Sequence, residues 1–159
     1  MWEGRRMDEA AVIEAAGTEL EGMRTVRLRV PARAEYIALA RLALSGLADI
    51  VALPEEQLAD LKLALTEAVS NSVRHAYGEG EGFVSVAYEL SGGLLAVEVV
   101  DDGEGFDPER PSALEGEELT EGGLGIAIIR TIADDFELDS RPGVRGSRLR
   151  FVKRLSRPA

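Results

Sequence analysis

Hydrophobic and polar residues alternate first as in a strand and then repeat at helical intervals. Residues 24–30 place Val26, Leu28 and Val30 on one face and polar side chains on the other, which predicts a half-buried strand. Apolar residues then recur with helical spacing over residues 32–50, which predicts a helix. A second helix is predicted from residue 54, where a proline and two acids form its first turn, to about residue 77.

The second half of the chain predicts mostly strands. Residues 84–90 and 95–99 each keep their apolar side chains on one face, and Ser91-Gly92-Gly93 between them predicts a hairpin turn. Residues 102–123 are rich in glycine and acids and have little periodicity. A loop of that length inside a domain is usually functional, so we expect it to act as a lid.

A last group of short elements closes the chain. Residues 124–132 predict a helix, residues 136–140 a strand, residues 141–143 a turn and residues 147–152 a final strand. This order keeps the helices apart from a mainly antiparallel sheet, so that they can cover one of its faces. The expected fold class is therefore an α/β two-layer sandwich.

One domain accounts for most of the chain. The length of 159 residues, 45% hydrophobic and 30% charged, suits a single globular domain, which we place at residues 23–155. Residues 1–22 are expected to be a weakly structured appendage, with a short helix considered around residues 8–16, and residues 156–159 a tail.

The composition excludes several classes of protein. A net charge of −11 makes direct binding to nucleic acid improbable, because neutralising phosphates needs a basic face. The chain has no cysteine, so it forms neither disulfides nor thiolate metal sites. It has no segment resembling a signal peptide and none approaching the 18 apolar residues of a membrane span, and we expect a cytoplasmic protein.

A polar ridge on the second helix suggests chemistry. Glu67, Asn71 and the only histidine, His75, are spaced four residues apart on a helix otherwise rich in leucine, alanine and valine. Such residues stack one turn above another, over about 12 Å. Each one alone has an ordinary interpretation as a solvated surface residue. Together, a carboxamide oxygen for Mg²⁺ and a carboxylate one turn earlier fit a phosphate-supported metal site.

Two glycine-rich segments follow this helix. Asp101-Asp102-Gly103-Glu104-Gly105 ends a predicted strand, where turn chemistry alone is the competing explanation. Gly122-Gly123-Leu124-Gly125 leads into a helix, whose free N–H groups suit an anionic phosphate. Neither segment is a P-loop, because the chain has no Gly-Lys pair, and neither matches the dinucleotide fingerprint.

Four ordered motifs together resemble the boxes of the GHKL ATP-binding superfamily. Glu67-x3-Asn71-x3-His75 resembles its N box, Asp101-x-Gly103-x-Gly105 and Gly123-Leu124-Gly125 resemble its glycine boxes, and Gly146-Ser147 resembles the last box. The sequences around the first and third of these motifs are similar to those of bacterial anti-sigma factors that are serine protein kinases. The resemblance implies the Bergerat-type fold, with a mixed, mainly antiparallel sheet and helices on one face.

The resemblance also implies roles for single residues. Glu67 would be the general base, Asn71 would hold Mg²⁺, Asp101 would bind the adenine amino group, and Arg41 on the first helix would be a candidate partner contact. Glu121 stands where some members have an arginine, so phosphate neutralisation would depend more on Mg²⁺ and backbone amides. The residues implied in ATP binding are Asn71, His75, Asp101, Gly103, Gly105, Gly123, Leu124, Gly125 and Ser147.

The function that the resemblance implies is a partner-switching kinase. Such a protein binds Mg²⁺-ATP, sequesters a sigma factor and phosphorylates an anti-anti-sigma protein on serine or threonine, and members of the family tend to form dimers. The alternative is a nucleotide-gated binding module without efficient phosphotransfer. A two-component histidine kinase is disfavoured, because the sole histidine belongs to the N box.

Overall fold

The computed structural model describes residues 12–17, 24–76, 82–103 and 122–156. These residues form six strands, three α-helices and one short 3-10 helix. In chain order they are β1 (Val12–Gly17), β2 (Arg24–Pro31), η2 (Ala34–Tyr36), α1 (Ile37–Val51), α2 (Glu55–Ala76), β3 (Phe83–Ser91), β4 (Leu94–Asp101), α3 (Gly122–Ile132), β5 (Asp135–Ser140) and β6 (Ser147–Arg154).

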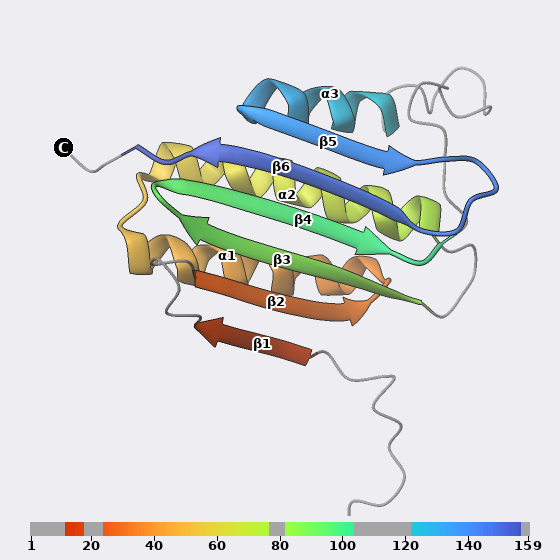
Figure 1. The fold of residues 1–159 in the computed structure, drawn as a ribbon, viewed down its shortest axis with the longest axis horizontal. Coiled ribbons are helices and arrows are strands. Elements are labelled where there is room, and N and C mark those ends of the chain that lie inside the picture. Colours follow the sequence, from red (N-terminus) through yellow and green to blue (C-terminus); the bar gives the residue numbers. More distant parts are fainter. Residues whose placement is uncertain (1–11, 18–23, 77–81, 104–121, 157–159) are drawn as a thin grey trace, which may run out of the picture.

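The six strands form one sheet in the order β1-β2-β3-β4-β6-β5 (Figure 1). Every neighbouring pair in the described sheet is antiparallel. Because β6 lies between β4 and β5, those two strands run in the same direction without touching. The connection from β4 to β5 includes α3, and this path carries the chain from the middle of the sheet to its edge.

The helices cover one face of this sheet, as the sequence predicts (Figure 1). The helix predicted from residue 32 begins with the 3-10 turn η2 and becomes α-helical only at Ile37, whereas the helix predicted over residues 54–77 is confirmed as α2. The core lies between the two layers. Its largest fully buried side chains include Leu28, Leu44, Leu61, Leu65, Tyr88, Ile129 and Phe151.

A buried tyrosine ties the first helix to the sheet. The Tyr88 hydroxyl donates a hydrogen bond of 2.6 Å to the backbone carbonyl of Ala40 on α1. Both residues are fully buried. A buried phenol needs such a partner, because an unpaired hydroxyl in the core costs free energy.

The predicted hairpin is confirmed as β3 and β4, and the two predicted closing strands are confirmed as β5 and β6. Gly92 and Gly93 connect β3 to β4 with φ values of +56° and +78°, which a glycine pair adopts without steric cost. In β4 the residues Leu95, Val97, Val99 and Asp101 share the buried, helix-covered face, because alternate side chains of a strand point the same way.

The short helix considered around residues 8–16 is wrong where the structure describes it. Residues Val12–Gly17 form strand β1, which pairs with β2 from Val12 opposite Arg29 to Gly17 opposite Arg24. Residues 8–11 lie outside the described part of the chain. The pairing gives hydrogen-bond partners to the outer edge of β2, and this non-local gain outweighs the local helical propensity of alanine and glutamate.

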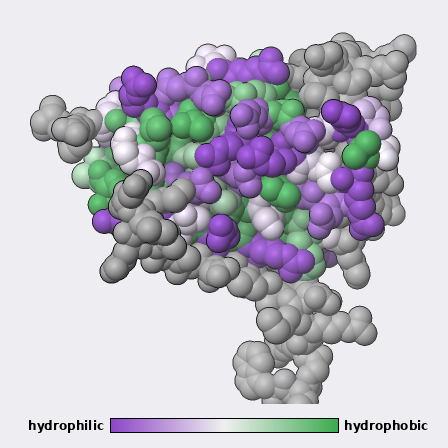
Figure 2. All heavy atoms as spheres, viewed as in Figure 1, coloured by the Kyte–Doolittle hydropathy of each residue, from purple (hydrophilic) through white to green (hydrophobic). Residues whose placement is uncertain are grey.

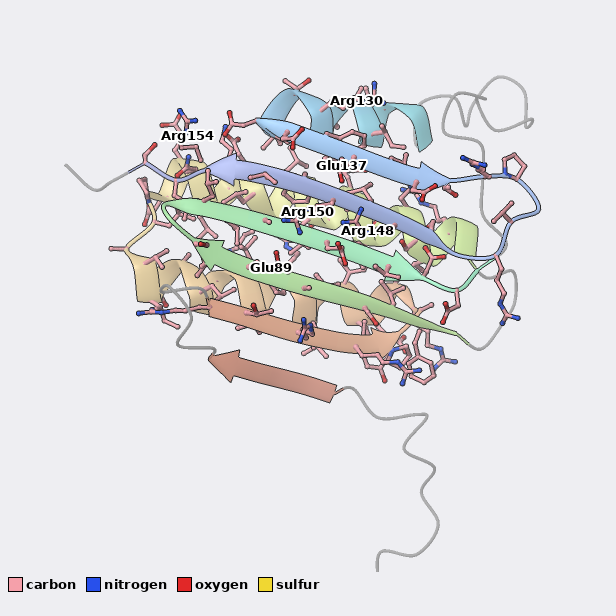
Figure 3. The ribbon with its side chains drawn as sticks, viewed as in Figure 1. Glu89, Arg130, Glu137, Arg148, Arg150 and Arg154 are labelled. Carbon is pink, nitrogen blue, oxygen red and sulfur yellow. The ribbon has the colours of Figure 1, made fainter. Side chains whose placement is uncertain are left out.

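No helix formed by the described residues covers the other face of the sheet, which bears charged side chains (Figures 2 and 3). Hydrophilic residues gather over the middle of this face, beside hydrophobic patches (Figure 2). Arg148 forms an ion pair of 2.7 Å with Glu98, and Arg150 forms one of 3.1 Å with Glu89. Burial alone would lower the pKa of the Arg148 guanidinium, but Glu98 and Glu137 together raise it. No helix in the described residues is long and apolar enough to cross a membrane.

Candidate functional site

Four elements that bear the predicted motifs end or begin at the same end of the molecule. The C-terminal end of α2, the end of β4, the start of α3 and the start of β6 lie there together (Figure 1). Sequence positions 67, 101, 125 and 147 are far apart along the chain. The β4–β6 pairing brings Asp101 beside Ser147, and the contact of α2 with α3 brings Glu67 beside Gly125.

Asp101 is the buried acid of this region. It is only 3% exposed, and it stands directly opposite Ser147 in the β4–β6 register. The Ser147 hydroxyl donates a hydrogen bond to Oδ2 of Asp101, and the backbone N–H of Gly103 donates one of 3.0 Å to Oδ1. Two donors fix the plane of the carboxylate, and each oxygen keeps a further lone pair for a ligand.

Gly146 closes the backbone behind Asp101. Its N–H donates a hydrogen bond of 2.7 Å to the carbonyl of Gly103, and its φ of +92° lies in the region that favours glycine. A Cβ on Gly146 would lie 3.2 Å from the backbone oxygen of Asp101. The predicted last box, Gly146-Ser147, therefore supports the same acid through both of its residues.

Glu67 lies where α2 meets the start of α3. A Cβ built on Gly125 would lie 2.5 Å from Oε2 of Glu67, so the carboxylate occupies the space beside this glycine. Next to it is a cleft of about 470 Å³. The cleft is lined by η2, α1, α2 and α3 through Ala34, Ile37, Glu67, Ser70, Val73, Arg74, Leu124, Gly125 and Ile128. A carboxylate in an open cleft is accessible to an incoming hydroxyl group.

The remaining residues of the ridge follow along α2. Asn71, one turn after Glu67, is 6% exposed, which places it at the boundary between helix and core. His75 lies in the last turn of α2, and its side chain is outside the described part of the structure. Of the predicted ridge, the structure therefore locates the Glu67 and Asn71 side chains.

Other predicted residues have varied positions. Gly103 is buried beside Asp101, whereas Leu124 is 54% exposed at the rim of the cleft. Arg41 is exposed on α1, and α1 reaches the cleft through Ile37. The second glycine box begins inside α3, whose first residue is Gly122. Gly105, Glu121 and most of the expected lid lie in residues 104–121, outside the described residues.

The sequence reasoning missed part of the cleft wall. Ser70 and Arg74 line it three and seven residues after Glu67, on the same side of α2. Their helical spacing from Glu67 could have predicted that both residues line the same cleft. Ala34 and Ile37 come from the start of the first helix, and no local pattern marks them as neighbours of Glu67.

The described side chains could hold a magnesium ion only together with ligands from a nucleotide or from water. Among the described residues, no three histidine, cysteine, aspartate or glutamate side chains are grouped closely enough to hold a metal. Asn71 supplies one neutral oxygen near the Glu67 carboxylate on the same helix. Mg²⁺ is commonly bound by one or two protein oxygens together with substrate phosphates and water, so this pair is compatible with a nucleotide-supported ion.

Comparison with family models identifies a match over most of the chain. The model of the histidine kinase-like ATPase domain matches residues 30–153. This range includes both glycine segments, the ridge on α2 and the Gly146-Ser147 pair.

Curated relatives agree with that match. The serine-protein kinase RsbW of Listeria innocua is 40% identical over 128 residues, which cover 75% of this chain and 82% of the relative. The serine-protein kinase RsbW of Oceanobacillus iheyensis is 34% identical over 128 residues, covering 75% and 81%. That of Staphylococcus aureus is 33% identical over 139 residues, covering 81% and 87%.

A solved structure supports the fold. A crystal structure of the RsbU and RsbW domains of a Mycobacterium tuberculosis protein superimposes with a TM-score of 0.63. The alignment covers 85% of this chain and 33% of that one, with 22% sequence identity. The predicted α/β two-layer architecture with helices on one face is therefore confirmed.

Proposed function

Because the chain belongs to the histidine kinase-like ATPase domain family, we propose that it is an ATP-dependent protein serine/threonine kinase of a partner-switching system. Relatives at 33–40% identity bear the name serine-protein kinase RsbW. In this proposal the protein sequesters a sigma factor and phosphorylates the anti-anti-sigma protein that would release it. A sigma factor as partner would place the protein in the cytoplasm.

The observation that supports catalysis most strongly is the position of Glu67. Its carboxylate lies against Gly125 at the start of α3 and borders an open cleft of about 470 Å³. A helix N-terminus favours phosphate groups, because its first N–H groups have no partner within the helix. A general base beside a phosphate-binding helix end would suit in-line phosphoryl transfer, because it orients the attacking hydroxyl toward the phosphate.

The buried acid supports nucleotide recognition. Asp101, held by Ser147 and Gly103, would accept a hydrogen bond from the exocyclic amino group of adenine. Guanine has a carbonyl oxygen at that position, which repels a carboxylate. The site would therefore select ATP over GTP. Gly105, His75 and Gly123 are proposed as further nucleotide contacts on the family motifs alone.

In the proposed reaction, Glu67 accepts the proton of a serine or threonine hydroxyl that has entered the cleft. The hydroxyl oxygen bonds to the γ-phosphorus of ATP while the bond to the β–γ bridging oxygen breaks, and ADP leaves. Asn71 is the residue that would hold magnesium, which would neutralise phosphate charge when bound. Most of the rate would come from positioning and charge neutralisation.

A phosphotransfer assay tests this proposal. Purified protein is incubated with Mg²⁺ and ATP labelled at the γ-phosphate, together with a candidate anti-anti-sigma protein. We expect a labelled phosphoserine or phosphothreonine on the acceptor, and Glu67→Gln should reduce its formation by at least a hundredfold while ATP binding persists. Absence of transfer by the unaltered protein in the presence of bound ATP would contradict the kinase assignment.

The same assay separates the second candidate, a nucleotide-gated binding module. In that case ATP would bind and change the affinity for the sigma factor, yet no label would reach the acceptor. The open cleft beside Glu67 favours the kinase, because a pure binding module has no need to expose this carboxylate.

A further inference from the structure

We propose that Gly125 is a positioning residue for Glu67: the missing side chain at position 125 makes room for the carboxylate of the general base. This inference rests on the proposed kinase function. A Cβ on Gly125 would lie 2.5 Å from Oε2, 3.5 Å from Cδ and 3.7 Å from Cβ of Glu67. Among the residues that the structure describes, the three nearest heavy atoms all belong to that one side chain.

The ordinary explanation of a glycine here is close approach of the backbone to a phosphate. The geometry indicates a different constraint, because the direction in which a Cβ would project is already filled by Glu67. An alanine at 125 would keep its backbone N–H. It would therefore keep the donor that a phosphate needs and lose only the space that the carboxylate occupies.

A Cβ at position 125 would force the Glu67 side chain to move. At 2.5 Å the atoms overlap, and the obstructing atom is the far end of a flexible side chain rather than backbone. Gly125→Ala is therefore expected to fold, with the Glu67 carboxylate displaced to another rotamer. A displacement of about 1 Å at a reacting group can reduce a rate by about a hundredfold.

Kinetics give the first test. At saturating Mg²⁺-ATP, Gly125→Ala should lower the phosphotransfer rate by at least tenfold while the ATP dissociation constant changes less than threefold. Glu67→Asp withdraws the carboxylate by one methylene group, so it should lower the rate in the wild type and raise it in the Gly125→Ala background. Such a rescue is specific to contact between positions 67 and 125, and a merely structural role of Gly125 does not produce it.

Stability of the protein without nucleotide gives the second test, which is independent of activity. Alanine is a better helix former than glycine, so this difference should stabilise the Gly125→Ala variant, whereas the collision with Glu67 should destabilise it. The change in Tm on Gly125→Ala should be more favourable in the Glu67→Ala background, by about 2–4 °C. Gly46→Ala is the matched control. Gly46 is an exposed glycine in α1, and a Cβ built on it has no atom of the described residues within 4 Å, so the substitution should shift Tm equally in both backgrounds.

The outcomes separate this inference from the function on which it rests. Wild-type transfer with an unchanged rate in Gly125→Ala, or equal Tm shifts in both backgrounds, overturns the inference and leaves the kinase assignment standing. If Gly125→Ala lowers the ATP affinity as much as it lowers the phosphotransfer rate, Gly125 acts in phosphate binding, and this inference is also overturned. Absence of wild-type transfer removes the proposed function, and the inference with it.

Discussion

Ser147 donates its hydroxyl hydrogen to Asp101, its direct neighbour across the β4–β6 pair. Both side chains are buried, at 7% and 3% exposure, on the helix-covered side of the sheet. A carboxylate buried at the end of a strand needs donors of this kind, because burying a charge without partners is costly. The serine therefore prepares the acid for the ligand that it is proposed to bind.

Removing that donor should weaken nucleotide binding. Ser147→Ala is expected to lower the affinity for ATP about three- to tenfold, because it removes one hydrogen bond worth about 1 kcal/mol from the acid that is proposed to bind adenine. Isothermal titration calorimetry measures the effect. Ser85→Ala on the open face of the sheet is a matched control and should bind ATP like the unaltered protein. Equal affinities in both variants would remove Ser147 from the site.

Asn71→Ala should remove the part of the ATP affinity that depends on magnesium. Asn71 offers the one neutral oxygen of the ridge, and no described cluster of acids and histidines replaces it. We expect the variant to bind ATP with the same affinity in magnesium and in EDTA, whereas the unaltered protein should bind more tightly with the metal. A variant that keeps the full response to magnesium would show that the ion is held elsewhere.

Tyr88→Phe should change both stability and its dependence on pH. At neutral pH the variant loses the hydrogen bond to the Ala40 carbonyl, at a cost of about 1 kcal/mol. Burial raises the pKa of the Tyr88 hydroxyl above its ordinary value of about 10. The Tyr88 hydroxyl therefore makes its full contribution to the free energy of unfolding at pH values below about 10. Above that pH the unfolded chain releases the proton and the folded chain keeps it.

As pH rises above 10, Tyr88 lowers the free energy of unfolding by about 1.4 kcal/mol per pH unit. Tyr88→Phe should show a shallower fall than the unaltered protein in urea unfolding measured between pH 9 and 11. Parallel pH curves for the two proteins would mean that the hydroxyl is not buried in solution.

The ion pairs on the open face should matter little for stability. Arg150 pairs with Glu89 at 3.1 Å, and both side chains remain about a quarter exposed (Figure 3). Exposed pairs contribute about 0–1 kcal/mol and are weakened by salt. Arg150→Gln should therefore lower the free energy of unfolding by less than about 1 kcal/mol, as measured by chemical denaturation, and leave ATP affinity unchanged. A larger loss would indicate a structural role for this face.

Local patterns predicted most of the elements in this fold. The alternation in residues 84–90 and 95–99 and the glycine pair between them determined the hairpin, because turn and strand preferences act over a few residues. The start of α1 was less predictable, since Ala34–Tyr36 form a 3-10 turn before the α-helix. Strand β1 was missed, because its pairing with β2 is decided by a partner outside its own sequence.

The candidate site was predictable as residue types and only partly as geometry. The spacing of Glu67 and Asn71 placed them one turn apart on α2, as observed. The contact between Glu67 and Gly125 joins residues 58 positions apart (125 − 67), and no spacing rule connects them. The same holds for Asp101 and Ser147, whose pairing depends on β6 entering the sheet beside β4.

The central claim is that an adenine nucleotide binds at the end of the molecule where α2, α3, β4 and β6 meet. A crystal structure of the complex with magnesium and a non-hydrolysable ATP analogue tests it most directly. We predict the adenine amino group within hydrogen-bonding distance of the Asp101 carboxylate and the phosphates near the start of α3. A nucleotide found instead in the hollow on the open face beside Arg27 and Arg29, with Asp101 and Glu67 remote from it, would contradict the account.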